Sequence, residues 1–118
     1  MEREIKFRGY SKNLGWIYGY YYQENNIHYI VEPVYREHIQ VDEKSINQFT
    51  GLKDKNNVEL YTDDIIKENK NEIASIQWHY GIGSYCWNYG EDFGMIDCSA
   101  VEKIGTLYEN TQLLQAVA

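Results

Sequence analysis

The chain has few of the residues and segments that mark membrane, secreted or disordered proteins. It contains no run of about 18 apolar residues, so no membrane-spanning helix is expected. Residues 1–4 are charged and no apolar segment follows them, which argues against a signal peptide. There is one proline, Pro33, and no low-complexity segment, so disorder is expected only at the termini. These absences predict a globular protein that works in a cytoplasm.

Cysteine is also scarce, with Cys86 and Cys98 the two in the sequence. Two cysteines are too few for a disulfide-dense secreted scaffold, so reduced thiols are expected. Cys86 lies between two aromatic residues on an alternating segment, and the simplest interpretation is a small buried thiol. The alternative, a nucleophile, needs a base such as His79 across a hairpin.

Positive charge is in short supply, since 11 Lys and Arg stand against 18 Asp and Glu, giving a net charge of −7. A protein that binds long nucleic acid without sequence preference needs a basic surface, so that class is not expected. The same charge permits either simple solubility or docking on a basic partner.

The pattern of the chain favours strands over helices. Short segments alternate between polar and apolar residues and are separated by turn residues, with no long helical period. The sequence predicts seven or eight strands and an all-β or β-rich α+β fold of small antiparallel, barrel-like curved sheets with at most short helical segments. We expect one domain over residues 1–118, with sub-lobes 1–47 and 48–118 as an alternative.

Particular segments carry this prediction. Ile5 and Phe7 are expected to point inward from the first strand, and Asp42 is expected to cap a helical turn over residues 43–47. A turn is expected at 24–26, loops at 67–72 and 90–97, and a short helix in the tail. The expected strands are 4–8, 16–22, 27–31, 34–41, 73–80, 85–89 and 101–108.

Three blocks of the sequence stand out. They are REIKFRG at 3–9 with GWIYGY at 15–20; VD at 41–42 with QFTGLKDKN at 48–56, ELY at 59–61 and DII at 64–66; and IGTLYEN at 104–110 with LL at 113–114. In this order they resemble the YopX family of phage and prophage proteins. The resemblance implies an accessory protein in the cytoplasm of the bacterial host, assembled as a homo-oligomer, and it carries no biochemical activity over to particular residues.

The second block has the character of structural turns. Gly51, Asn57, Asp63 and Asp64 stand where the chain must fold back between short strands. The family has glycine where Asn57 and Asp63 stand, and Asn and Asp tolerate positive φ better than most residues do. The fold is therefore expected to survive both departures.

The sequence contains no arrangement of residues typical of an enzyme. His28, His38 and His79 have no companions at metal-ligand spacing, so no metal, cofactor or catalytic residue is expected. The pair Asp63–Asp64 is interpreted as a turn that binds backbone amides, with acid–base chemistry or cation binding as the alternative. The glycines at 81 and 83 are interpreted as a hairpin turn rather than a phosphate-binding loop.

Aromatic residues are abundant, with 12 Tyr, 3 Trp and 3 Phe. An aromatic ladder across the hairpin at 76–89 would serve as core, as a contact between subunits, or as a stacking platform for a base. The residues predicted to bind a ligand are Tyr20, Tyr22, Trp78, Tyr80, Tyr85, Trp87 and Arg8.

Two functions follow as hypotheses. The first is a non-enzymatic counter-defence protein that sequesters a nucleotide-like small ligand at the aromatic-lined sites of an oligomer. The alternative is an acidic inhibitor that docks on a basic host protein, such as a nuclease, a CRISPR-type effector or a polymerase subunit. The first is motivated by the aromatic residues and the second by the net charge.

Overall fold

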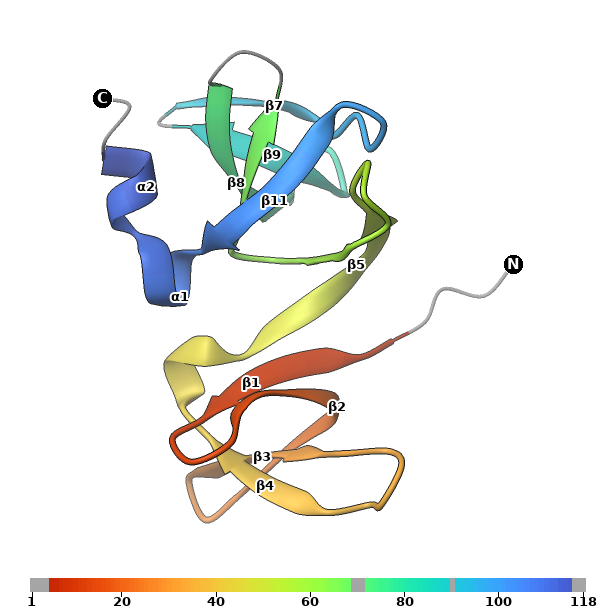
Figure 1. Cartoon of the computed structure of the whole chain (residues 1–118), viewed down its shortest axis with the longest axis vertical. Helices are drawn as coiled ribbons and strands as arrows, with labels where there is room; N and C mark the ends of the chain where they lie inside the picture. The colour runs from red at the N-terminus through yellow and green to blue at the C-terminus, as the bar shows by residue number, and fades with distance from the viewer. Residues whose placement is uncertain (1–4, 69–71, 90, 116–118) are drawn as a thin grey trace. The chain divides into compact units, whose positions relative to one another are not determined.

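The computed structural model describes residues 5–68, 72–89 and 91–115. Most of them lie in antiparallel strands, whose sheet orders are β4-β3-β2-β1-β5-β6 and β10-β9-β8-β7-β11 (Figure 1). The predicted β-rich class is therefore confirmed. Each sheet ends on two different edge strands, so neither is closed into a barrel. The described residues hold strands β1 to β11, more than the seven or eight predicted.

The chain divides into two compact units, Met1–Phe49 and Thr50–Ala118, close to the sub-lobe boundary considered from the sequence. We describe each unit by itself, as unit 1 and unit 2. Strand β5 begins in unit 1, where it pairs with β1, and continues into unit 2. None of the helices among the described residues has the length and apolar character needed to cross a bilayer.

Unit 1 is a meander of hairpins followed by one turn of 3-10 helix. In the β2–β3 hairpin, Asn25 and Asn26 have φ values of 53° and 64°. Two central residues with positive φ suit the right-handed twist of the flanking strands, and the predicted turn at 24–26 is confirmed. The elements are β1 Phe7–Ser11, β2 Gly15–Glu24, β3 Ile27–Val31, β4 His38–Val41, η1 Glu43–Ser45 and β5 Asn47–Lys53.

The helical turn η1 forms as predicted, although it ends at residue 45 instead of 47. The carboxylate of Asp42 accepts a hydrogen bond from the backbone N–H of Lys44 at 3.2 Å and so caps the turn. The hydroxyl of Ser45 accepts from the backbone N–H of Tyr10 at 2.7 Å. This bond ties η1 to the end of β1.

The prediction that Ile5 points inward from the first strand was wrong, whereas Phe7 is half-buried and packs against the ring of Tyr21. The strand begins at Phe7, and Ile5 is 64% exposed. The fully buried side chain of this strand is Arg8, at 1% exposure. Burial of a charged side chain is possible because β1 lies between β2 and β5, and β5 supplies a polar partner, Asn47.

The strand expected at 34–41 begins only at His38. Val34 and Tyr35 are exposed and lie in a turn after Pro33. The carboxylate of Glu32 accepts hydrogen bonds from the backbone N–H groups of both residues, which stabilises the turn over a longer strand.

Unit 2 contains the second sheet and two short helices. The loop predicted at 67–72 was wrong at its ends, because Glu68 belongs to β7 and Glu72 to β8, while 69–71 lie outside the described residues. The predicted loop at 90–97 contains the edge strand β10, whose exposed position hides its alternation. The elements are β6 Glu59–Tyr61, β7 Asp64–Glu68, β8 Glu72–His79, β9 Ser84–Tyr89, β10 Asp92–Met95, β11 Val101–Thr106, α1 Leu107–Asn110 and α2 Gln112–Gln115.

The last strand ends earlier than the predicted residue 108. The hydroxyl of Thr106 accepts a hydrogen bond from the backbone N–H of Glu109 at 3.1 Å, which caps α1. Asn110 turns back and accepts from the backbone N–H of Thr106 at 3.2 Å. The predicted short helix of the tail is confirmed as α2.

The turns of the second block adopt the backbone that the sequence interpretation requires. Gly51, Asn57 and Asp63 have φ values of 83°, 67° and 64°. Asp63 lies in the tight turn between β6 and β7, and Asn57 lies in the loop between β5 and β6. Gly51 was also predicted to lie in a turn, but it lies inside strand β5. Asn and Asp therefore take the left-handed conformation that glycine adopts most readily.

Asp54 organises the loop that contains Asn57. One carboxylate oxygen accepts from the backbone N–H groups of Asn56 and Val58 at 2.8 and 2.9 Å. The other accepts from the backbone N–H of Lys103 in β11 at 2.9 Å. Burial alone would raise the pKa of Asp54, but these three hydrogen bonds and the Lys103 charge outweigh it, and the pKa is lowered.

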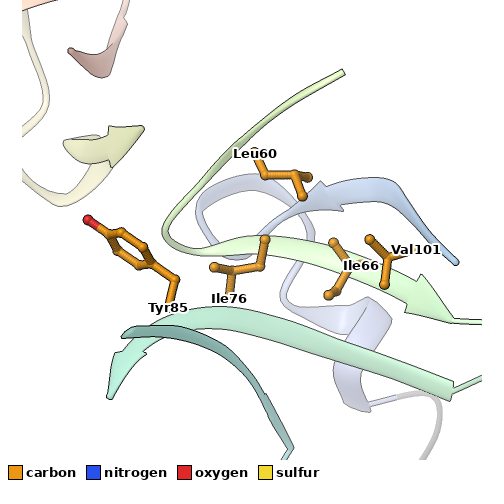
Figure 2. Packing of buried hydrophobic residues seen from close by; sticks show 5 residues of the cluster. All are labelled: Leu60, Ile66, Ile76, Tyr85 and Val101. Carbon is orange, nitrogen blue, oxygen red and sulfur yellow. The ribbon is translucent and has the colours of Figure 1, made fainter. Parts of the chain in front are cut away.

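The core of unit 2 lies on one face of its sheet. Its buried side chains come from β6, β7, β8, β9 and β11 and form one cluster (Figure 2). Trp87 packs against this cluster as a partly buried side chain. The cluster consists of Leu60, Ile66, Ile76, Tyr85 and Val101.

Candidate functional site

The hairpin of β8 and β9 places its aromatic residues on the core face of unit 2. Trp78 is directly opposite Tyr85, and Ile76 is opposite Trp87. The rings of Trp78 and Tyr85 meet edge to face, with centroids 4.9 Å apart and an interplanar angle of 74°. Tyr80 extends the row, with its ring centroid 6.5 Å from that of Trp78. The ladder predicted across this hairpin therefore forms.

The members of the ladder differ in their access to solvent. Tyr85 is 7% exposed and belongs to the core cluster, so its ring is occupied in packing. Trp78 is 37% exposed and Tyr80 is 91% exposed. Trp87 is half-buried. Of these predicted ligand-binding residues, Trp78, Tyr80 and Trp87 keep surface that a partner can reach.

The other predicted binding residues belong to unit 1. Arg8 was expected to meet a phosphate, but it is buried and donates a hydrogen bond to the side-chain oxygen of Asn47 at 3.1 Å. Its guanidinium lies 4.6 Å from the centre of the Trp16 ring. These contacts give Arg8 a structural role, and its guanidinium does not face solvent.

Tyr22 takes part in a small aromatic cluster on unit 1, whereas Tyr20 is 63% exposed. The Tyr22 ring stacks on Tyr29, with centroids 5.0 Å apart, and its hydroxyl forms a hydrogen bond with Nδ1 of His38 at 2.8 Å. The pKa of Tyr22 is raised, first by desolvation and then by the neighbouring Tyr29 and Glu24. Tyr22 is therefore partnered within its own sheet.

A pocket of about 310 Å³ opens in unit 2, at the end of the core face that lies away from the β8–β9 turn. It combines an aromatic wall, an aliphatic floor and three carboxylates, and its lining includes no Lys or Arg among the described residues. The lining residues are Ile66, Glu68, Glu72, Ile73, Ala74, Trp87, Tyr89 and Asp92.

The register of the sheet explains how the carboxylates come together. Glu68 of β7 is directly opposite Glu72 of β8, so two negative charges face each other across one strand pair. Asp92 of β10 is directly opposite Tyr89 of β9. Like charges in directly opposite positions destabilise a sheet. The pocket therefore carries electrostatic repulsion that a positive charge would relieve.

Gly94 of β10 allows the Trp87 indole to occupy its position in the pocket wall. The two residues are directly opposite each other. A Cβ atom added at Gly94 would lie 2.7 Å from carbon atoms of the indole, well inside van der Waals contact. Only glycine leaves the ring room to lie over the backbone of β10.

Trp87 is the one lining residue that was proposed as a binding residue from the sequence, and the polar or aromatic residues that were missed are Glu68, Glu72, Tyr89 and Asp92. Glu68, Glu72 and Asp92 were assigned to loops, where charged residues are expected to be solvated. The available signal was the two-residue alternation of a strand, because Glu68 lies two residues after Ile66 and Glu72 lies two residues before Ala74. Since the residues at these strand ends are charged, the alternation between apolar and polar residues was not recognised there.

Asp64 of the acidic pair has the predicted hydrogen bond to a backbone amide, and Asp63 binds a side-chain amide. Asp64 is fully buried, accepts from the backbone N–H of Tyr61 at 2.7 Å, and forms a salt bridge with Lys103 at 3.3 Å. Asp63 accepts from the side-chain amide of Gln77 at 2.8 Å. Both carboxylates therefore hold the β6–β7 turn in place.

The remaining sequence candidates do not form a reactive constellation. Cys86 is fully buried and lies opposite Gln77, while His79 lies opposite Ser84 and stacks on Phe93 with centroids 4.1 Å apart. The residues at 80–83 form the predicted hairpin turn. Within the described ranges, no group of three or more His, Cys, Asp or Glu residues is placed to hold a metal ion.

Comparison with known proteins adds one assignment. No curated protein matches this chain. The model of the YopX protein family matches residues 6–115, which is nearly the whole chain. The chain therefore belongs to the YopX family.

Proposed function

We propose that this member of the YopX family is a non-enzymatic binding protein that docks on a basic protein of the host cell. The observation that carries the proposal is the pocket of unit 2, where three carboxylates border an aromatic wall. The net charge of −7 acts in the same direction, because it attracts a basic partner over long distances.

Aromatic residues near the pocket supply the apolar contact that such docking needs. Tyr89 is 37% exposed and Trp87 is half-buried, and both project from the same face of β9. Interfaces are enriched in aromatic residues and depleted of charge at their centre, with charged groups at the rim. Unit 2 offers both components on adjoining strands.

The nucleotide-sequestering hypothesis stays a prediction, with weaker support. The three carboxylates of the pocket would repel a phosphate, and Arg8 is buried in unit 1. The exposed row of Trp78 and Tyr80 is the feature that still favours stacking on a base. The predicted homo-oligomer and the counter-defence role likewise stay predictions.

The proposal can be tested by capture from host lysate with two charge-reversed variants. One variant carries Glu72→Lys and Asp92→Lys at the pocket, and the control carries Glu24→Lys and Glu37→Lys in unit 1. Each variant has a net charge of −3, since two changes of +2 are added to −7. Any difference between them therefore reports position rather than total charge.

We expect the unaltered protein to retain basic host proteins at low salt and to release them at about 0.5 M salt, where exposed charges are screened. The unit 1 control should retain the same proteins, identified by mass spectrometry, while the pocket variant should lose most of them. Equal capture by the pocket variant and the control would contradict docking through this surface.

A further inference from the structure

We propose that the pocket of unit 2 binds the guanidinium group of an arginine side chain on the partner protein. The inference rests on the proposed function, in that it names the group of the basic partner that enters the protein. It is carried by three features of the pocket, namely its paired carboxylates, its aromatic wall and its size.

The carboxylates supply the charge and the hydrogen-bond acceptors. Glu68 and Glu72 face each other directly across β7 and β8, and Asp92 contributes a third carboxylate from β10. A guanidinium carries five N–H donors in a planar fork, so it can donate to more than one carboxylate at once. Its positive charge also relieves the repulsion between the two opposed glutamates.

The aromatic wall supplies a surface on which a planar cation stacks. Trp87 and Tyr89 alternate with Asn88 along β9, so they project from the same face of the strand. The indole of Trp87 is held over the β10 backbone at Gly94, and the position is therefore fixed before any ligand arrives. Indole is the best aromatic partner for a cation, and guanidinium stacks more readily than ammonium.

The pocket has enough room for an arginine side chain. Its volume of about 310 Å³ is at the lower end of the range of roughly 300–1,000 Å³ for small-molecule sites. Unit 1 contains the same pairing inside the chain, because Arg8 lies 4.6 Å from the centre of the Trp16 ring and hydrogen-bonds Asn47. In unit 2 the aromatic and acceptor groups are present, and the partner provides the cation.

The assignment can be tested by titrating the full-length protein with n-butylguanidinium and following the three indole N–H resonances by NMR. The neutral isostere n-butylurea and the compact cation n-butylammonium serve as comparison ligands. We expect the Trp87 resonance, assigned with Trp87→Phe, to shift saturably with a Kd on the order of millimolar, as befits a ligand of few atoms. Butylurea should bind at least about tenfold more weakly and butylammonium about threefold more weakly.

Conservative substitutions test whether the carboxylates of the pocket bind the cation. Glu72→Gln and Asp92→Asn should each weaken butylguanidinium binding about three- to tenfold, whereas Glu91→Gln, one residue outside the lining, should leave it unchanged. These positions are exposed, so the variants are expected to fold, and the unperturbed resonances of the core will show that they do. The assignment is overturned if butylurea binds equally well, if Trp87 does not respond, or if Glu91→Gln weakens binding as much as Asp92→Asn.

Failure of this inference is distinguishable from failure of the proposed function. If butylguanidinium binds in the pocket but no basic protein is retained from lysate, the pocket assignment stands and the docking function falls. If a basic protein is retained equally by the unaltered protein and by Asp92→Asn with Glu72→Gln, but is lost by Glu72→Lys with Asp92→Lys, docking stands and the arginine assignment is overturned. Equal affinity for butylammonium would overturn the choice of arginine over lysine.

Discussion

The two units of the protein use the same aromatic residues under opposite electrostatic conditions. In unit 1, Trp16 has a cation from its own chain, the buried guanidinium of Arg8. In unit 2, Trp87 borders a pocket with three carboxylates and no basic residue in its described lining. Unit 1 completes the cation–aromatic arrangement internally, whereas unit 2 leaves the position of the cation to a partner.

The charged group of unit 1 contributes to stability, whereas the charged groups of the unit 2 pocket are available for binding. A buried cation with its hydrogen-bond acceptor and its aromatic neighbour stabilises the unit that contains it, because removing any partner leaves a polar group unsatisfied. A group of carboxylates with no such cation costs some stability and is retained where a ligand can use it. Four changes would break or sharpen the comparison.

The largest effect is expected for Arg8→Met in unit 1. The substitution leaves the side-chain oxygen of buried Asn47 without this donor and removes the cation from the Trp16 ring, so we expect a loss of about 2–4 kcal/mol. Urea denaturation followed by circular dichroism measures it, with Lys12→Met in the exposed β1–β2 turn as the control. A loss no larger than that of the control would mean that the internal cation contributes nothing to unit 1.

A second change removes a charge of unit 2, that of Asp54, which is satisfied within the chain. Asp54→Asn should cost about 1–3 kcal/mol near neutral pH, because the carboxylate accepts three backbone N–H groups. The pKa of Asp54 is lowered from 3.8, so its stabilising effect is complete above that value and is lost as the pH falls through the lower pKa of the folded state.

The measurement for Asp54 is the free energy of unfolding of both proteins from pH 7 to pH 2. The difference between the unaltered protein and Asp54→Asn should be constant at high pH and should shrink below about pH 3.8. A difference that grows on acidification has the wrong sign and would refute the role of the carboxylate.

The third change disturbs the pocket wall without altering charge. In Gly94→Ala the new methyl group would lie 2.7 Å from the Trp87 indole, so the ring must shift, at a cost of about 1–2 kcal/mol. The double variant with Trp87→Leu should show a smaller cost for the alanine, because the shorter side chain leaves room. Chemical denaturation of the four proteins gives the coupling, and strictly additive costs would argue against this contact.

The smallest effect has the opposite sign. Glu72→Gln removes one of two opposed charges in the pocket, so it should stabilise the protein by about 0.2–1 kcal/mol while weakening the binding of a cation. Glu91→Gln is the matched control and should change the stability by less. A loss of stability in Glu72→Gln would show that the carboxylate serves the fold rather than a ligand.

The β-rich class and several turns were predictable because they depend on neighbours in sequence. Asn25 and Asn26 predicted a hairpin, Asp42 predicted a cap, and Asn57 and Asp63 predicted positive φ, all of which are found. Each of these features is a local competition between side-chain and backbone hydrogen bonds, so a few adjacent residues decide it.

The candidate site was predictable only in part. Trp87 was included from its place in the aromatic hairpin, whereas Glu68, Glu72 and Asp92 were assigned to loops. Arg8 was expected to be an exposed phosphate ligand and is buried instead, because its acceptor Asn47 comes from a strand 39 residues later in the sequence. The pattern of neighbouring residues around Arg8 carries no information about a partner so far away in the sequence.

By itself, the sequence determined the family of this protein, its strand-rich class, its turns and its acidic character, since these follow from residue type and short-range spacing. Only the tertiary structure decided which charges are satisfied internally and which border a pocket. That decision depends on strand register, which sets Glu68 opposite Glu72 and Gly94 opposite Trp87. Register is fixed by the packing of the whole sheet, because a shift of one residue would exchange its two faces.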